Sequence, residues 1–283
     1  MLISEALETA TDKLTAAGVL SPSVDAELLG CFVLNVSRSD LTMLSLRDEL
    51  FTKDQFVEFE TVVLRRVKRE PLQHITGIAP FRHLELHVGR GVFIPRPETE
   101  QLVGLALERL RIIDKPLVVD LCSGSGAIAI ALTTELSGSR VLSVEVSVEA
   151  FEFLSANYQK YGLNSKNAKN EDLASAFEEL QGQVDLVISN PPYIPNSAVP
   201  IDLEVQLHEP SLALYGGEDG LDVIRRISTR ALFLLKSSGL LLLEHSDSQA
   251  QAVSQLLLSQ GWQEVVSSQD LAGKDRITSA RKP

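Results

Sequence analysis

A strand, a glycine-rich loop and a helix follow one another over residues 116–136, and this succession limits the possible folds more than any other part of the chain. The apolar residues before Asp120 predict a short strand of a parallel sheet, and residues 127–136 predict an amphipathic helix. Between them, Gly124 and Gly126 allow the backbone to approach a ligand and point helix N-terminal N–H groups at it. A glycine-rich turn without any ligand has the same pattern. The loop residues that we expect to bind a cofactor are Cys122, Ser123, Gly124, Ser125 and Gly126.

Strands and helices alternate through the rest of this region, which indicates a doubly wound, mostly parallel α/β sheet of Rossmann-like type. After the first strand, further strands are expected at residues 141–144, shortly before Asp172, and at 184–189, 240–244, 262–266 and 276–280. We expect the last two to form a closing antiparallel pair in a seven-stranded sheet. Helices are expected at residues 97–110, 221–235 and 248–259.

Acidic residues follow the first three strands. Glu145 can accept hydrogen bonds from both hydroxyls of a ribose, and Asp172 can bound an adenine pocket in which Leu173 packs on the ring. NAD-dependent dehydrogenases and S-adenosylmethionine-dependent methyltransferases share this layout. A carboxylate at Asp120 would repel a pyrophosphate but attract the ammonium and sulfonium groups of S-adenosylmethionine. This charge argument favours the methyl donor.

The turn Asn190-Pro191-Pro192-Tyr193 directly follows the fourth strand. The two prolines fix φ and donate no hydrogen bonds, so we expect a rigid, exposed turn. The Asn190 side chain and the Pro191 carbonyl can accept two hydrogen bonds, and Tyr193 offers a flat face. This combination suits a planar –NH2 group, although a plain strand-to-loop turn with an exposed aromatic ring has the same pattern.

A third segment makes the pattern more specific. Residues 93–100, Phe-Ile-Pro-Arg-Pro-Glu-Thr-Glu, together with the turn at Asn190, resemble the release-factor glutamine methyltransferases, the HemK/PrmC family of class I S-adenosylmethionine-dependent methyltransferases. The resemblance covers essentially the whole chain. It includes Glu209-Pro210, the Gly-Gly-Glu-Asp-Gly run at 216–220, and a strand that ends in Glu244-His245. Cys122 and Glu145 depart from it, because glycine and aspartate are more usual there.

The resemblance implies that Asn190, Pro191 and Tyr193 are catalytic, that Asn190 also borders the bound cofactor, and that Pro192 also lines the substrate-binding turn. It implies S-adenosyl-L-methionine as methyl donor, which leaves as S-adenosyl-L-homocysteine. The implied target is the amide nitrogen of the glutamine in the Gly-Gly-Gln motif of class I peptide chain release factors. We expect direct transfer to the clamped nitrogen, because holding two reactants together can contribute ~7–11 kcal/mol. No catalytic triad and no metal site is evident.

Three other functions fit parts of the pattern. The turn at Asn190 can clamp a flipped adenine in DNA or RNA. The net charge of −12 argues against a large nucleic-acid surface, and we expect no direct nucleic-acid partner. A noncatalytic cofactor-binding regulator is a second alternative. A related enzyme that methylates a glutamine of a ribosomal protein is the third, but the segment at residues 95–98 favours the release-factor type.

The chain of 283 residues is long enough for one large and one small domain. We expect a helical substrate-docking domain at residues 1–70, a hairpin connector at 71–95 and the methyltransferase domain at 96–283. Two cysteines suit a reducing compartment, and the first residues lack a basic secretory start. No apolar run approaches the ~20 residues of a membrane span. We expect a cytoplasmic monomer.

Local signals place helices in the first domain. Apolar residues from Ile3 to Leu14 lie on one helical face before Gly18. Ser21-Pro22 predicts the start of a second helix, and Thr52-x-x-Gln55 predicts a capping box for a last one. Four basic residues at 65–69 complement the dipole of this last helix. A second hypothesis is that they contact an acidic protein partner.

Overall fold

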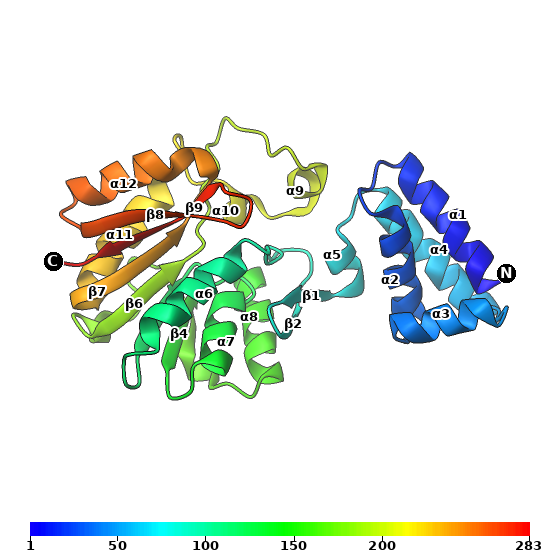
Figure 1. The fold of residues 1–283 in the computed structure, drawn as a ribbon, viewed down its shortest axis with the longest axis horizontal. Helices are drawn as coiled ribbons and strands as arrows, with labels where there is room; N and C mark the ends of the chain where they lie inside the picture. Colours follow the sequence, from blue (N-terminus) through cyan, green and yellow to red (C-terminus); the bar gives the residue numbers. More distant parts are fainter. The chain divides into compact units, whose positions relative to one another are not determined.

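The computed structural model describes all residues from Met1 to Pro283, and the chain forms two compact units. The first unit contains Met1–Ile78 and, from much later in the chain, Pro200–His208. The second contains Ala79–Val199 and Glu209–Pro283. Figure 1 shows the helices of Met1–Ile78 in blue to cyan and the sheet of the second unit in green to red. No helix in the chain is both long enough and apolar enough to cross a membrane.

The first unit is helical, as expected. Its helices are α1 (Ile3–Ala16), α2 (Pro22–Leu34), α3 (Arg38–Leu46), α4 (Lys53–Val67), α5 (Leu72–Thr76) and α9 (Leu203–His208). The core contains Leu14, Leu29 and Phe59, which are completely buried. The capping box is confirmed: Gln55 N donates to Thr52 Oγ1, and Thr52 N donates to Gln55 Oε1. Ser21 lies at the N-cap of α2, but its side chain makes no capping hydrogen bond.

The basic residues at the end of α4 have acidic partners within the chain. Arg65 pairs with Glu70 at 2.6 Å. Arg66 is buried between Asp25 and Glu204, at 2.7 Å from each, and Arg69 contacts the same Glu204 carboxylate at 2.9 Å. The hypothesis of an acidic protein partner is therefore wrong for the buried Arg66 and stays a prediction for the more exposed Arg65. Removing one member of such a buried pair typically costs 3–5 kcal/mol.

The hairpin expected within residues 71–95 is confirmed by the pairing of β1 (Ile78–Phe81) with β2 (Leu84–His87). The Asn157 side chain binds the backbone of His87 in β2. Asn157 Oδ1 accepts from the backbone N–H of His87 at 2.7 Å, and Asn157 Nδ2 donates to the His87 carbonyl at 3.0 Å. The same side-chain amide donates to the Ser125 carbonyl at 2.9 Å. One buried residue thus joins the hairpin to the glycine loop.

The second unit contains the expected seven-stranded sheet, in the order β5-β4-β3-β6-β7-β9-β8. Its strands are β3 (Leu117–Leu121), β4 (Arg140–Glu145), β5 (Ala168–Asn170), β6 (Val184–Ser189), β7 (Leu235–Glu244), β8 (Gln263–Gln269) and β9 (Asp275–Arg281). Only β9 runs against the others, since it pairs antiparallel with both β7 and β8. The expected closing pair is confirmed, and β7 begins five residues before its predicted start at Leu240.

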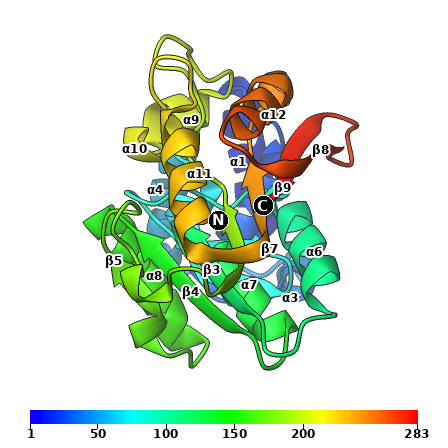
Figure 2. The ribbon, with the colours of Figure 1, turned by 90° about the vertical axis from the view of Figure 1, so that its left-hand side faces the viewer.

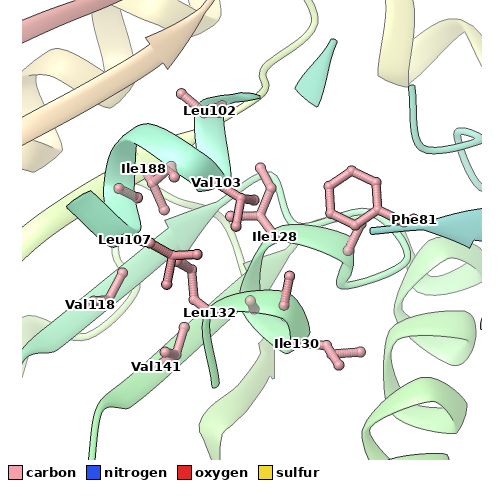
Figure 3. Packing of buried hydrophobic residues seen from close by; sticks show 14 of the residues in the cluster. Phe81, Leu102, Val103, Leu107, Val118, Ile128, Ile130, Leu132, Val141 and Ile188 are labelled. Carbon is pink, nitrogen blue, oxygen red and sulfur yellow. The ribbon is translucent and has the colours of Figure 1, made fainter. Parts of the chain in front are cut away.

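Helices cover both faces of the sheet (Figure 2). The helices of this unit are α6 (Thr99–Leu110), α7 (Ala127–Glu135), α8 (Val148–Lys160), α10 (Ser211–Leu214), α11 (Asp222–Leu234) and α12 (Ala250–Ser259), with short 3-10 turns at Ser165–Asn167, Glu178–Leu180 and Asp247–Gln249. Side chains alternate along each central strand. Val118 packs in the apolar cluster with α6, α7 and α8, which Figure 3 shows, and its neighbour Val119 packs in the cluster with α11 and α12.

The helix after the glycine loop differs from its prediction. All residues from Ala127 to Leu132 are buried, so the first part of α7 is apolar on every side and not amphipathic. This burial fixes the start of α7 and therefore the position of the loop before it. The chain order also reverses here, because β4 lies on one side of β3 and β6 on the other. Ligands of open α/β sheets bind at such a switch point.

Candidate active site

The first carboxylate of the site, Asp120, lies near the end of β3 and is completely buried. Neither of its side-chain oxygens has a hydrogen-bond partner. Burial, together with the charge of Glu145, raises the pKa of Asp120 to about 8. A buried group without a partner is costly, so it marks a place where a cationic or hydrogen-bond-donating ligand is stabilised.

The glycine loop needs its small residues for two different reasons. Cys122, Gly124 and Gly126 all have positive φ, at +62°, +54° and +87°. A Cβ at Gly126 would also lie 2.6 Å from a Leu154 methyl group of α8, so close packing excludes any larger residue there. The positive φ at Cys122 favours glycine, although no packing contact requires it. Glycine is also the residue that is more usual in the family at this position.

The second carboxylate, Glu145, ends β4 and holds the loop in place. Its Oε2 accepts from Gly124 N and its Oε1 from Ser147 N, each at 2.8 Å. Burial raises the pKa of Glu145, against the effect of these hydrogen bonds. Each carboxylate oxygen has two acceptor sites. Glu145 can therefore support the loop and still accept hydrogen bonds from a ligand.

The third predicted cofactor position has a different environment. Asp172 forms an ion pair with Arg226, and its Oδ1 accepts from Ala174 N at 2.8 Å. Leu173 is buried in the apolar cluster beneath α11 and α12. The charge of Asp172 is thus already compensated within the protein, unlike that of Asp120.

The turn after β6 is more enclosed than expected. Pro191 is buried, and Asn190, Pro192 and Tyr193 are half-buried, so the prediction of an exposed turn is wrong. The reason is the dense packing around the end of β6. Asn190 Nδ2 donates to Thr99 Oγ1 at 3.0 Å, and Thr99 is itself only 3% exposed at the start of α6. Just before the turn, Ser189 Oγ donates to the Leu121 carbonyl at the end of β3.

The loop at residues 216–220 packs closely against the turn after β6 and holds its backbone in place. Ile194 N donates to the Leu214 carbonyl at 2.8 Å, and Gly216 N donates to the Ile194 carbonyl at 2.9 Å. A Cβ at Gly216 would lie 2.6 Å from the Pro192 oxygen, and one at Gly220 would lie 2.3 Å from the Tyr193 oxygen. The sequence pattern placed these glycines in the family but did not reveal this role.

Two other family segments also meet in the structure. Arg96 Nη2 contacts Glu209 Oε1 at 3.1 Å, and Ile94 N donates to the same carboxylate. The Arg96 guanidinium lies 5.0 Å from the centre of the Phe93 ring. These contacts hold the segment that leads into α6, and with it Thr99.

A further acid was missed as a site residue by sequence reasoning. Glu244 ends β7 and is only 2% exposed. Burial raises the pKa of Glu244 to about 7, while Thr99, Arg276 and Asn190 favour the ionised form. Its Oε2 has no hydrogen-bond partner. Its sequence signals were an acid at the end of a long apolar strand and the place of Glu244-His245 in the family pattern.

The histidine after this acid is held by structural contacts. His245 is buried, and its Nε2 lies 2.7 Å from Thr278 Oγ1 on β9. Its Nδ1 lies 2.8 Å from the Ser246 carbonyl. Because burial lowers the pKa of His245, the ring favours the neutral form.

The sheet order and the two loops at the switch point define a class I methyltransferase. Residues 5–77 match the family model described as "PrmC N-terminal domain", and residues 91–211 match "Methyltransferase small domain". A solved structure of a ribosomal protein L11 methylase from Lactobacillus delbrueckii shares the fold. It aligns with a TM-score of 0.51 and 19% identity over 73% of this chain and 99% of its own.

Curated relatives are more specific. The chain is 43% identical to "Release factor glutamine methyltransferase" of Streptomyces coelicolor, over 100% of this chain and 98% of the relative. It is 42% identical to the protein of the same name from Bifidobacterium longum, over 99% of both. The chain belongs to the release factor glutamine methyltransferase family.

Proposed function

We propose that this protein transfers a methyl group from S-adenosyl-L-methionine to the side-chain amide nitrogen of the glutamine in the Gly-Gly-Gln motif of class I peptide chain release factors. Family membership supports the substrate class. The observation that carries the chemistry is the state of the Asn190 amide. Its nitrogen is bound to Thr99, so its oxygen is left as an acceptor next to the carbonyl of Pro191.

The residues around the glycine loop fit the methyl donor. When bound, S-adenosylmethionine supplies an electrophilic methyl group on a positively charged sulfur. The unpaired oxygens of Asp120 would attract the positive methionine end. Glu145 would accept from the ribose hydroxyls, and Asp172 and Leu173 would border the adenine. The loop from Cys122 to Gly126, including Ser123, Gly124 and Ser125, would provide backbone contacts.

The turn residues would orient the substrate amide. Amide nitrogen is a poor nucleophile because its lone pair is delocalised into the carbonyl group. Hydrogen bonds from the substrate –NH2 to Asn190 Oδ1 and the Pro191 oxygen would fix the plane of the amide, and Tyr193 would pack against it. Pro192 keeps the turn rigid. Positioning of this kind is the largest rate contribution available here, at ~7–11 kcal/mol.

The two parts of the chain have different proposed roles. We propose that the helical domain, residues 1–70, docks the release factor and that residues 71–95 connect it to the methyltransferase domain, 96–283. A cytoplasmic monomer suits an enzyme that acts on free release factors. Adenine methylation of DNA or RNA is disfavoured by the net charge of −12, which would repel phosphates.

The test is a methyl-transfer assay with labelled S-adenosylmethionine. The protein is incubated separately with a class I release factor, with its variant carrying alanine in place of the motif glutamine, and with duplex DNA. We expect label in the release factor alone. Label in the DNA, or equal label in the alanine variant, would overturn the proposal.

A further inference from the structure

We propose that Thr99 and Glu244 are positioning residues that fix which end of the Asn190 side-chain amide faces the substrate. In this arrangement the Glu244 carboxylate accepts from the Thr99 hydroxyl, and Thr99 Oγ1 accepts from Asn190 Nδ2. Asn190 Oδ1 is then left to accept from the substrate amide. The inference rests on the proposed function, because it needs a substrate that donates hydrogen bonds to Asn190.

The need for such a device follows from the shape of asparagine. The oxygen and nitrogen ends of the amide are nearly identical in size, so packing alone does not choose between them. With the nitrogen end toward the substrate, the Asn190 –NH2 would face another –NH2. Two donors repel each other, and the substrate would lose the acceptor on which its orientation depends.

Thr99 alone does not decide the orientation. Its hydroxyl lies 3.0 Å from Asn190 Nδ2, but a hydroxyl can either donate or accept. An ionised carboxylate only accepts. If the Thr99 proton is donated to Glu244, the hydroxyl oxygen can serve Asn190 only as an acceptor. Glu244 therefore gives the whole chain of hydrogen bonds one direction.

The fold brings these three residues together from separate elements. Thr99 begins α6, Asn190 follows β6, and Glu244 ends β7. Ser189 pairs with Leu243 in the parallel register, so Asn190 and Glu244 are the next neighbours along the two strands. Both Thr99 and Asn190 stabilise the ionised form of Glu244. Helix α6 also packs against β7, so Thr99 and the Glu244 carboxylate lie in neighbouring elements, and the hydrogen bond between them is the link that we propose.

The burial of Glu244 and its incomplete hydrogen bonding support a role beyond packing. It is 2% exposed, and its Oε2 has no hydrogen-bond partner. Arg276, the cation that favours its ionised form, contacts Asp270 at 3.4 Å instead. A buried acid held only in part by its neighbours is costly to keep, and the methyl-transfer step itself does not use it. Orientation of Asn190 accounts for its presence.

The proposed direction requires Glu244 to be ionised. The charged and titratable groups that face it are Arg276 on β9, Glu98 before α6, and Tyr193 in the turn. Burial keeps the pKa of Glu244 at about 7, so the carboxylate gains charge as the pH rises from 6 to 8. A protonated Glu244 can donate to Thr99 and reverse the chain. Methyl transfer should therefore increase over this pH range.

The test compares substitutions that change hydrogen bonding while keeping the volume. In Thr99→Val and Glu244→Gln we expect kcat for release-factor methylation to fall about 10- to 100-fold, the scale of a misplaced substrate. The Kd for S-adenosylmethionine should stay within twofold of the wild-type value. Thr99→Ser restores the hydroxyl and should recover most of kcat. The matched control is Glu108→Gln, an exposed acid on α6 that takes no part in these hydrogen bonds, which should keep wild-type kcat.

The pH profile separates positioning from a purely structural role. Wild-type kcat should rise between pH 6 and 8, and Glu244→Gln should be low and flat over that range. Equal kcat in Thr99→Val and Thr99→Ser, or an unchanged profile in Glu244→Gln, would overturn the inference while leaving the proposed function intact. The comparison of Thr99→Val with Thr99→Ser tests the inference even if Glu244→Gln does not fold. A wild-type protein that labels no release factor would overturn both.

Discussion

The two loops at the switch point of the sheet lie on neighbouring strands but are stabilised in opposite ways. The loop after β3 leaves both Asp120 oxygens buried and unpaired. In the turn after β6, the Asn190 nitrogen is bound by Thr99, and Gln249 Nε2 donates to the Tyr193 carbonyl at 2.8 Å. One loop lacks partners for its charge, whereas the other is held by the protein before any ligand arrives.

The two loops therefore have different roles in the site. A loop with an unpaired buried acid gains its missing interactions from a charged ligand, so binding and stability are linked there. A preformed turn gains little stability from its ligand but holds reacting groups in place. Substitutions in the first loop should therefore affect ligand affinity and stability, and substitutions in the turn should affect the chemical step.

The largest effect is expected for Asn190→Ala. Loss of the acceptor should reduce kcat for glutamine methylation by about 10²–10³-fold, the usual scale for one preorganised polar group. The Kd for S-adenosylmethionine, measured by calorimetry, should stay within about twofold because Asn190 belongs to the preformed turn. Tyr193→Ala should reduce kcat less. Full activity in Asn190→Ala would remove the proposed mechanism.

A smaller effect is expected when the support of the turn is disturbed. Gly220 has φ +77°, and a Cβ there would lie 2.3 Å from the Tyr193 oxygen. Gly220→Ala should lower the free energy of unfolding by about 1–3 kcal/mol through strain and displacement of the turn, and should also lower kcat. Urea unfolding and the methyl-transfer assay measure the two effects.

The matched control for this substitution is Gly162→Ala. Gly162 has a similar φ of +65°, but a Cβ there would meet no atom within 4 Å. It therefore reports the backbone strain alone and should leave kcat unchanged. If both variants lose the same stability and keep full activity, the loop at 216–220 does not position the turn.

The Asp120→Asn variant tests the other side of the comparison. The pKa of Asp120 is raised to about 8 in the folded protein, against about 3.9 when unfolded. The stability that this group contributes is complete below the unfolded pKa and is lost as the pH rises through the folded value. Without ligand, the free energy of unfolding of the wild type should therefore fall relative to Asp120→Asn between pH 5 and 8.

Urea unfolding at pH 5, 7 and 8 measures this difference, and saturating S-adenosylmethionine should reduce it by stabilising the ionised carboxylate. The variant should bind the ligand roughly 10-fold more weakly, because one opposite charge is lost. If the free energy of unfolding changes with pH in the same way in both proteins, the charge of Asp120 is already compensated within the protein. The two loops would then not differ in how they stabilise their polar groups.

The smallest effect is expected for Cys122→Gly. Relief of strain at φ +62° and the greater freedom of glycine in the unfolded chain oppose each other, so stability should change by less than about 1 kcal/mol. Cofactor affinity should be unchanged, while the β-branched Cys122→Val should be clearly destabilised. A large loss of affinity in Cys122→Gly would show that the thiol itself contacts the ligand.

The sequence alone determined the features that depend on neighbours along the chain. The capping box at Thr52, the strand–loop–helix around Gly124 and the hairpin before residue 95 follow from local φ preferences and from side-chain periodicity. Acids at strand ends were visible in the same way, because a strand end is a local feature. The strands were therefore predictable in number and kind, and Asp120, Glu145 and Asn190 could be proposed as site residues.

The contacts between these residues depend on the three-dimensional fold. Arg66 was predicted as part of a surface patch but is buried with Glu204, and Asn190 was predicted in an exposed turn but is bound to Thr99. Thr99 and Asn190 are separated by 91 residues, and the glycines at 216–220 reach the same turn from a third segment. Such pairings depend on the order and register of the strands. Strand order and register are set by burial of the whole sheet. They cannot be read from the residues that flank each site residue in the sequence.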